Sequence, residues 1–162
     1  MFRNKTKYLW MLAIMLLIIS CRKKMSEEDM KAEERLQIQN FLSLNDTLTF
    51  VPTSSGLYHT DLTVGTGPGV VTDDNVWVFY TMKLLNGTLI ESNALSTDTL
   101  VFQVGKDEVI KGFDEGVTYM KQGGESLFIL PSQLAFGDGK AYGVRSYTPL
   151  LLNVKLLKVK QH

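Results

Sequence analysis

The sequence has few of the residues on which most enzymes depend. It contains one cysteine, Cys21, and two histidines, His59 and His162. A single cysteine excludes an internal disulfide bond, so the stability of the fold must come from its core. A serine triad or a histidine-based metal site is hard to assemble from two histidines. Any chemistry of this chain must therefore need few ionisable groups.

The chain also has no excess of charge of either sign. It carries 17 basic and 17 acidic side chains. Three of the basic ones, Arg3, Lys5 and Lys7, belong to a segment that we expect to be removed, which leaves 14 basic against 17 acidic residues from position 21 onward. The acidic residues are scattered over turns and helix ends, so a glycosidase-like carboxylate pair has no particular support. Nothing in this balance favours a nucleic acid as a partner.

The first 20 residues have the pattern of a secretory signal peptide. "MFRNKTKYLW" carries three basic side chains and no acidic one, and "MLAIMLLII" is an apolar run too short to span a bilayer comfortably. The run ends at Ile18-Ile19-Ser20-Cys21, which resembles the lipobox of bacterial lipoproteins, where cleavage leaves a lipid-modified cysteine at the N-terminus. A plain signal anchor with an incidental cysteine is the alternative.

This pattern predicts where the protein acts. We expect residues 1–20 to be removed and Cys21 to be lipidated. The protein would then be lipid-anchored to a membrane of the cell envelope, facing the periplasm. Each acyl CH₂ buried in the bilayer contributes about 0.8 kcal/mol, so two or three acyl chains hold a domain at a membrane without a spanning helix.

Residues 21–50 are predicted to form a largely helical spacer between the lipid anchor and a domain at residues 51–162. "SEEDMKAEERLQIQNFLSLND" is rich in good helix formers, and its apolar stripe is patchy. Ser26 and Asp29 have the spacing of a capping box. The pattern favours a solvated, charged face on this helix over a weak interaction surface.

The sequence of the domain predicts short strands separated by turns. In "VWVFYTMKLLNGTLIES", two apolar runs flank Asn86-Gly87, a dipeptide that tolerates the positive φ angles of a type I′ hairpin turn. Trp77 and Phe79 share the outer face of the first run, and we expect the spacer helix to cover them. Further strands are predicted in "DTLVFQVG", "ESLFILP" and "PLLLNVKLLKVK", with a long loop in "SQLAFGDGKAYGVRSYT".

A short helix is predicted over residues 107–120, and its buried stripe is predicted to consist of Val109, Ile110, Phe113, Val117 and Met120. Gly112 and Gly116 lie one turn apart, and each costs about 1 kcal/mol of helix propensity relative to alanine. We interpret them as sites where the helix packs closely against the sheet or a neighbouring loop. About five strands and one short helix predict an α+β domain in which a curved antiparallel sheet folds over a single helix.

The order of these motifs resembles that of FKBP-type peptidyl-prolyl isomerases, the immunophilin family that binds the macrolide tacrolimus. The resemblance covers about residues 57–159 and rests on "VFYTMKLLNGTLIES", "FQVGKDEVIKGFDEGVTYMKQGGES", "PSQLAFG" and "TPLLLNVKLLKV", in that order. It implies an FKBP-like fold for the domain. The succession of lipobox, charged helix and domain is similar to that of FKBP-like lipoproteins of Gram-negative bacteria.

The resemblance also implies a site. It assigns catalytic positions to Tyr80, Glu91, Ile110, Phe113 and Phe136, and positions in a substrate-binding pocket to Ile90, Leu100, Val109, Val144 and Leu152. The backbone N–H of Ile110 would bind a carbonyl group of the ligand. The sequence departs from the family at several of these positions. Phe113 replaces the tryptophan of the pocket floor, Phe136 replaces a tyrosine, and Glu91 replaces an aspartate. Aliphatic side chains replace phenylalanine at Ile90, Leu100 and Leu152.

The implied function is that of a peptidyl-prolyl cis–trans isomerase that assists the folding of exported proteins, with proline-containing polypeptides as substrates and no cofactor or metal. An apolar pocket that favours the twisted amide needs no nucleophile. One alternative is a catalytically weak or inactive FKBP-fold binding module in a cell-envelope assembly, such as the gliding-motility lipoproteins, with envelope proteins as partners. A holdase-type chaperone is another. The reduced aromatic lining favours these alternatives, and Tyr80, Val109 and Ile110 favour the isomerase.

Overall fold

The computed structural model describes residues 25–162, so the predicted signal peptide and Cys21 lie outside the described residues. The helices are α2 (Glu27–Leu44), α3 (Lys111–Val117) and the 3₁₀ helix η1 (Ser132–Leu134). The strands are β1 (Val51–Pro52), β2 (Tyr58–Thr63), β3 (Asn75–Leu84), β4 (Leu89–Ser92), β5 (Leu100–Gln103), β6 (Glu125–Leu130) and β7 (Leu150–Lys160). Within this part of the chain, no helix combines the length and the hydropathy that crossing a bilayer requires.

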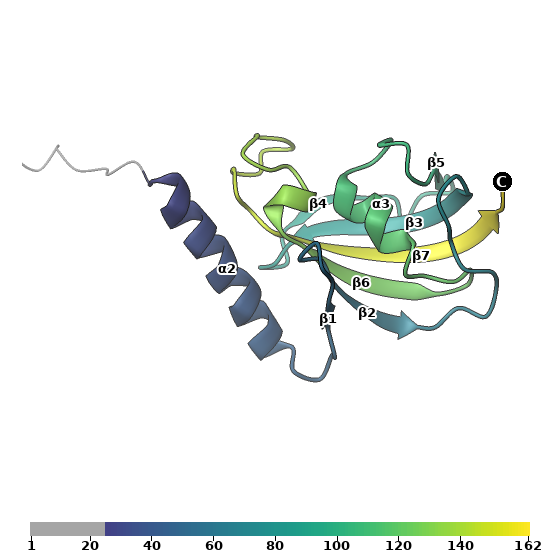
Figure 1. The fold of residues 1–162 in the computed structure, drawn as a ribbon, viewed down its shortest axis with the longest axis horizontal. Coiled ribbons are helices and arrows are strands. Elements are labelled where there is room, and N and C mark those ends of the chain that lie inside the picture. The colour runs from purple at the N-terminus through teal and green to yellow at the C-terminus, as the bar shows by residue number, and fades with distance from the viewer. Residues whose placement is uncertain (1–24) are drawn as a thin grey trace, which may run out of the picture.

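The strands form one antiparallel sheet, in which β1, β2, β6, β7, β3 and β4 are neighbours in that order and β5 pairs with β3. The sheet curves around α3 (Figure 1). The core between them consists of alternate residues of the long central strands, such as Val76 and Val78 of β3 and Leu152, Val154 and Leu156 of β7. The predicted fold class is confirmed, and the sheet has seven strands where the sequence suggested about five.

Helix α3 is shorter than the predicted 107–120. Asp107 has a positive φ of 55°, and Ile110 is in an extended conformation, so the chain turns before it becomes helical at Lys111. The expected buried stripe is confirmed for Phe113, Val117 and Met120. Val109 and Ile110, which were predicted in the same stripe, precede the helix and are half-buried.

The two glycines of α3 are confirmed as sites of close packing. A Cβ atom on Gly112 would lie 2.7 Å from Leu130 Cδ2 and 3.1 Å from the Leu134 carbonyl oxygen. A Cβ atom on Gly116 would lie 3.2 Å from the Phe128 ring. Without side chains at these two positions, α3 lies directly against β6 and the segment that follows it.

The hairpin between β3 and β4 is confirmed, but its turn is not of type I′. Only Gly87 has a positive φ, of 89°, whereas a type I′ turn requires positive φ at Asn86 as well. The N–H of Gly87 bonds to the Leu84 carbonyl at 2.9 Å, and the N–H of Leu84 bonds to the Thr88 carbonyl at 2.8 Å. The connection is therefore a longer loop that ends in a left-handed glycine, consistent with the register shift between Met82 and Lys83.

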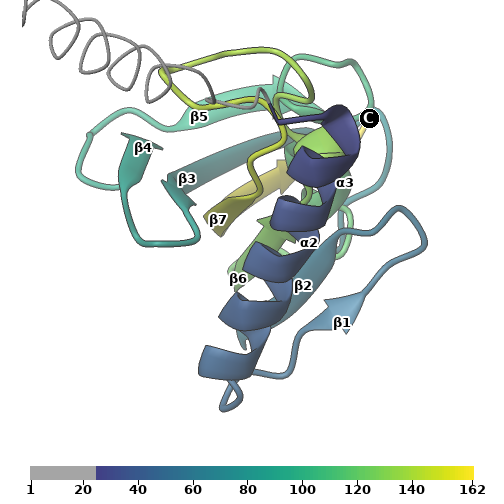
Figure 2. The same ribbon diagram turned by 90° about the vertical axis from the view of Figure 1, so that its left-hand side faces the viewer.

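Helix α2 begins at the predicted capping box. The N–H of Asp29 bonds to the Ser26 hydroxyl, and the N–H of Ser26 bonds to the Asp29 carboxylate, both at 3.1 Å. The helix lies across one end of the sheet (Figures 1 and 2). Trp77 pairs with Lys158 near the C-terminal end of β7, away from α2, so the expectation that the spacer helix covers Trp77 is wrong. The Lys158 ammonium lies over the Trp77 ring instead, 4.8 Å from its centroid.

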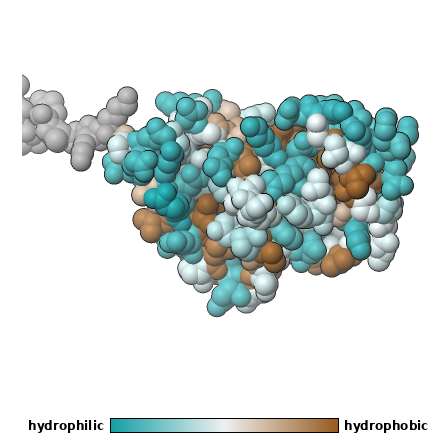
Figure 3. All heavy atoms as spheres, viewed as in Figure 1, coloured by the Kyte–Doolittle hydropathy of each residue, from teal (hydrophilic) through white to brown (hydrophobic). Residues whose placement is uncertain are grey.

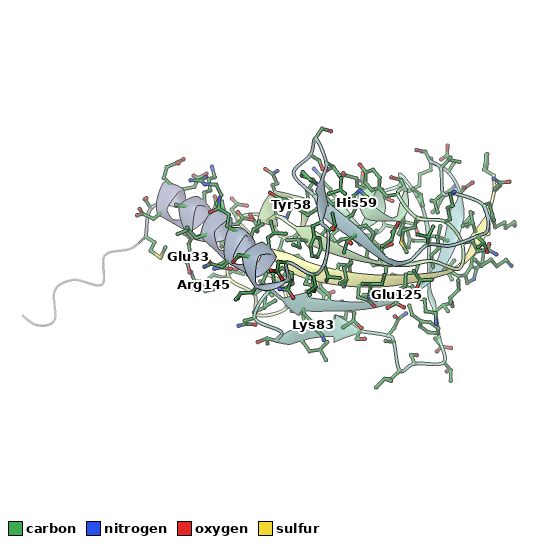
Figure 4. The ribbon with its side chains drawn as sticks, turned by 90° about the horizontal axis from the view of Figure 1, so that it is seen from below. Glu33, Tyr58, His59, Lys83, Glu125 and Arg145 are labelled. Atoms are coloured by element: carbon green, nitrogen blue, oxygen red, sulfur yellow. The ribbon has the colours of Figure 1, made fainter. Side chains whose placement is uncertain are left out.

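One side of α2 packs on the domain. Glu34 and Ile38 are buried. The Glu34 carboxylate accepts hydrogen bonds from the backbone N–H of Ser132 and, at 2.9 Å, from its hydroxyl. Arg145 and Glu33 form an exposed ion pair at 3.3 Å (Figure 4). These contacts attach α2 to the segment that connects β6 with β7.

Replacing Glu34 by alanine is expected to release α2 from the domain. The change removes two hydrogen bonds to a buried carboxylate and leaves the Ser132 donors unpaired, which costs about 2 kcal/mol or more. Amide hydrogen exchange in residues 27–44 should accelerate by more than tenfold, because each 1.4 kcal/mol changes the opening equilibrium about tenfold. Glu28, which is exposed on the same helix, is the matched control. Equal exchange in the two alanine variants would show that Glu34 does not hold the helix.

Candidate active site

An apolar cavity of about 380 Å³ opens beside the N-terminal end of α3. Its walls come from β3, β4, the start of β5, the turn before α3 and the loop that follows η1. The lining residues are Tyr80, Met82, Glu91, Leu100, Glu108, Val109, Ile110, Phe113, Phe136 and Tyr142. Aromatic and aliphatic groups dominate this set, as they do in pockets that bind small organic groups.

The floor of the cavity is Phe113, whose side chain is 2% exposed. Its ring makes edge-to-face contacts with Tyr80 and Phe102, with ring centroids 5.4 Å and 5.3 Å away. Such contacts stabilise aromatic pairs by about 0.5–1.5 kcal/mol beyond the burial of area. The ring orientation is therefore fixed by β3 and β5, and the close packing of α3 on β6 fixes the helix that carries it.

The turn before α3 presents a backbone donor at the cavity. Ile110 is the N-cap residue of α3, with φ −61° and ψ 147°, and its carbonyl accepts hydrogen bonds from the N–H groups of Phe113 and Asp114. Its own N–H has no acceptor among residues 25–162. The Asp114 carboxylate accepts from the N–H of Gly105 at 2.9 Å, which ties the start of this turn to the helix. The donor of Ile110 is thus held in place.

Tyr80 and Glu91 bring the polar groups of the cavity together from β3 and β4. Burial raises the pKa of the Tyr80 hydroxyl to about 12, and a hydrogen bond to Glu91 and the negative charge of Glu91 add to this effect. The backbone at Tyr80 is held by Asn93, whose side-chain oxygen accepts from the Tyr80 N–H at 2.7 Å and whose amide donates to the Val78 carbonyl at 3.2 Å. The hydroxyl is therefore a neutral hydrogen-bonding group at physiological pH.

The raised pKa of Tyr80 predicts a loss of stability in alkali. Below pH 10 the hydroxyl is protonated in both the folded and the unfolded chain, and between pH 10 and 12 only the unfolded chain ionises. The unfolded state then binds fewer protons than the native state, so the free energy of unfolding falls as pH rises. Urea unfolding should show a smaller decrease over this interval in Tyr80→Phe than in the wild type. Parallel curves would exclude this contribution of Tyr80.

The loop after η1 forms one wall of the cavity with two aromatic rings. Phe136 and Tyr142 are tilted against each other, with centroids 5.6 Å apart. Tyr142 has a positive φ of 52° and is 68% exposed. Tyr142 is far more exposed to solvent than Phe113 at the floor, so a substrate polypeptide can enter the cavity from this side.

Comparison with known proteins assigns the family. A family model described as FKBP-type peptidyl-prolyl cis-trans isomerase matches residues 67–157, more than half of the chain. The chain belongs to the FKBP-type peptidyl-prolyl cis-trans isomerase family. The curated FKBP "FK506-binding protein 4" of Emericella nidulans is 38% identical over 105 residues, which are 65% of this chain and 22% of that protein.

Two further members of the FKBP family extend the comparison. A "Peptidyl-prolyl cis-trans isomerase" of Saccharomyces cerevisiae is 36% identical over 65% of this chain and 25% of its own length. The crystal structure of a peptidyl-prolyl cis-trans isomerase from Pseudomonas syringae pv. tomato has a TM-score of 0.72 and 26% identity, covering 86% of this chain and 99% of that chain. The chain thus spans about a quarter of the curated FKBP proteins described here.

The FKBP fold brings together seven of the ten residues that the sequence assigned to the site. Those that line the cavity are Tyr80, Glu91, Leu100, Val109, Ile110, Phe113 and Phe136. Leu152 is not among the lining residues and is fully buried in the core on β7. Ile90 and Val144 line a neighbouring hollow beside α2 instead.

The FKBP resemblance left three residues of the lining unassigned. Met82 shares a strand face with Tyr80 two positions away, so strand alternation alone was a sufficient signal for it. Tyr142 lies in the long loop after η1, where the resemblance assigned only Val144, and nothing in the sequence marked Glu108. Among residues 25–162, no group of three or more histidine, cysteine, aspartate or glutamate side chains is arranged to hold a metal ion.

Proposed function

We propose that this protein is a peptidyl-prolyl cis–trans isomerase that assists the folding of exported polypeptides from a lipid anchor in the cell envelope. The observation that carries the proposal is the cavity over Phe113. It combines an apolar floor with the neutral hydroxyl of Tyr80 and with the N–H of Ile110, which has no acceptor in the part of the chain that the structure describes. These groups match the needs of a proline side chain and the carbonyl that precedes it.

The chemistry requires only that the cavity bind the twisted amide better than either planar form. Rotation about an X-Pro amide has a barrier of about 18–20 kcal/mol, because resonance gives the C–N bond partial double-bond character. An apolar cavity excludes the water that stabilises the polar planar form. The proline ring would lie on Phe113, and the Ile110 N–H would donate to a substrate carbonyl. No bond is formed or broken, so the small number of ionisable groups in the cavity is no obstacle.

The lipid anchor rests on the N-terminal pattern and on the length of chain that follows it. Cys21 is six residues before the start of α2 at Glu27, a stretch that extends about 20 Å at most. A lipid on Cys21 would therefore keep the domain close to the bilayer. Replacing Cys21 by alanine should abolish the incorporation of labelled fatty acid into the protein. Labelling that persists in the alanine variant would contradict lipidation at this residue.

The isomerase is tested with a substrate protein whose refolding is limited by proline isomerisation. Such refolding takes tens to hundreds of seconds unaided, and the wild-type protein should accelerate it at substoichiometric concentration. Phe113→Leu keeps an apolar floor of similar burial but removes the ring, so we expect a rate lower than that of the wild type. Wild-type refolding at the uncatalysed rate would refute the proposal.

The alternative of a non-catalytic binding module has one observation in its favour. The hydroxyl that the family carries at the position of Phe136 is missing, and a lost neutral hydrogen bond costs about 0.5–1.5 kcal/mol, or up to about tenfold in rate. A module of this kind would bind a proline peptide and leave its isomerisation rate unchanged. The alternative of a holdase-type chaperone has less support than the binding module, because a holdase needs a broad apolar surface. Hydrophobic residues are scattered among hydrophilic ones on the face in Figure 3 and form no single broad patch there.

A further inference from the structure

A second hollow, of about 620 Å³, lies beside the proposed proline cavity. Its walls are α2, the β3–β4 hairpin and residues 142–148. We call it the α2 groove. Its apolar lining includes Phe41 and Leu44 from α2, Leu84 and Leu89 from the hairpin, and Tyr142 from the loop. Figure 2 shows the hairpin on one side and α2 on the other.

Large apolar side chains around this groove remain in contact with solvent. Leu44 is 83% exposed and Leu89 is 59% exposed. Single exposed leucines are common on protein surfaces. Here they gather with Tyr142 around one concave site, and such an arrangement is typical of surfaces that bind a partner.

The wall formed by α2 is held in place by specific contacts. The buried Glu34 carboxylate bonds to Ser132, and Glu33 pairs with Arg145, which itself lines the groove. The helix is thus fixed against the same β6–β7 connection that carries Phe136 and Tyr142. The groove is therefore built into the domain.

The groove adjoins the proline cavity. Tyr142 lines both. Successive side chains of a strand point to opposite faces, and on β4 Ile90 lines the groove while Glu91 lines the cavity, so the strand separates the two at this point. A chain bound with its proline over Phe113 would therefore pass Tyr142 and enter the groove.

The chemistry of the lining fits an extended, apolar polypeptide. Arg145 is the only charged residue among the lining side chains that the structure describes, and Gln37, Asn40 and Asn86 supply amide groups that both donate and accept hydrogen bonds. Strand β4 is at the edge of the sheet, and edge strands can pair with an extended chain. Leucine and aromatic side chains can bury apolar groups of that chain.

We infer that the α2 groove binds the apolar segment of a substrate polypeptide that adjoins the isomerised proline. This inference rests on the proposed isomerase function, since the proline cavity defines where that segment begins. It makes α2 part of the substrate-binding surface. Substrates with an apolar flank should therefore bind more tightly than short proline peptides.

The test compares fluorescent peptides by anisotropy with the full chain. One is a short proline peptide, and two others extend it by alternating leucine and serine on the N-terminal or on the C-terminal side. One extension should tighten binding to the wild type by about tenfold, as burial of one apolar side chain would. The double variant Leu44→Ser/Leu89→Ser should lose this gain and retain the affinity for the short peptide. The matched control is Leu62→Ser, a leucine 44% exposed on β2, which should behave as the wild type does.

The outcomes separate the groove from the isomerase. Equal affinity of the wild type for short and extended peptides would overturn the inference, as would equal losses for both peptides in the double variant. A change of oligomeric state in the double variant, with unchanged peptide binding, would assign the groove to a second copy of this chain and also overturn it. If the wild type fails to accelerate refolding but still binds the extension in a groove-dependent manner, the isomerase fails and the groove stands.

Discussion

Replacing Gly112 by leucine is expected to lower the free energy of unfolding by about 3 kcal/mol, the upper range for overpacking a core. A Cβ atom at this position would lie 2.7 Å from Leu130 Cδ2 and 3.1 Å from the Leu134 carbonyl oxygen. The leucine at 130 can move aside, but the backbone of η1 cannot do so without disturbing the wall that carries Phe136. The gain of about 1 kcal/mol in helix propensity offsets only part of the strain.

The control for this substitution is Lys111→Leu, at an exposed position of the same helix. It should change the free energy of unfolding by less than about 0.5 kcal/mol. Thermal unfolding monitored by circular dichroism should place the midpoint of Gly112→Leu about 10 °C below that of the wild type. If both variants melt together, α3 does not need a glycine at 112 to approach the sheet.

Replacing Ile110 by proline is expected to reduce isomerase activity by about 10- to 100-fold while the fold is kept. The φ of Ile110, −61°, is already that of proline, and its N–H has no acceptor among residues 25–162. The substitution therefore removes a donor that the domain itself does not use. A substrate carbonyl would lose a hydrogen bond and remain unpaired in an apolar cavity, which costs about 1–3 kcal/mol.

The matched control is Ile110→Val, which trims the side chain by one carbon and keeps the N–H. Its activity should stay within about tenfold of the wild type, because losing one buried CH₂ costs about 0.8 kcal/mol. Both variants should have wild-type circular dichroism spectra. If the proline variant is as active as the valine variant, the backbone of residue 110 takes no part in binding the substrate.

Local sequence patterns predicted the features of the fold that depend on nearby residues. The Ser26–Asp29 capping box and the alternation along β3 follow from spacing alone. Gly112 and Gly116 indicated close packing of α3, because each glycine lowers the helix propensity relative to alanine. The start of α3 escaped prediction because the backbone of Asp107 and Ile110 is fixed by turn geometry that apolar periodicity does not record.

The features that the sequence did not predict depend on long-range contacts. In the sequence, Glu34 is one of several acidic residues on a charged helix. Its burial depends on Ser132, which is 98 positions away. For the same reason the sequence did not indicate which residues of α2 pack on the domain. Leu152 and Ile90 were carried into the site from family positions, but with their shorter side chains one lies in the core and the other lines the α2 groove.

The most direct test of the proposed function is the rate of cis–trans exchange in a proline-containing peptide, measured by NMR exchange spectroscopy with a substoichiometric amount of the protein. No refolding substrate or coupled reaction is needed, so the rate reports on the amide bond itself. We expect exchange cross-peaks between the cis and trans resonances on a timescale of a second or less, against tens to hundreds of seconds for the peptide alone. Resonances shifted by binding, with exchange no faster than in the free peptide, would contradict catalysis and leave a binding module.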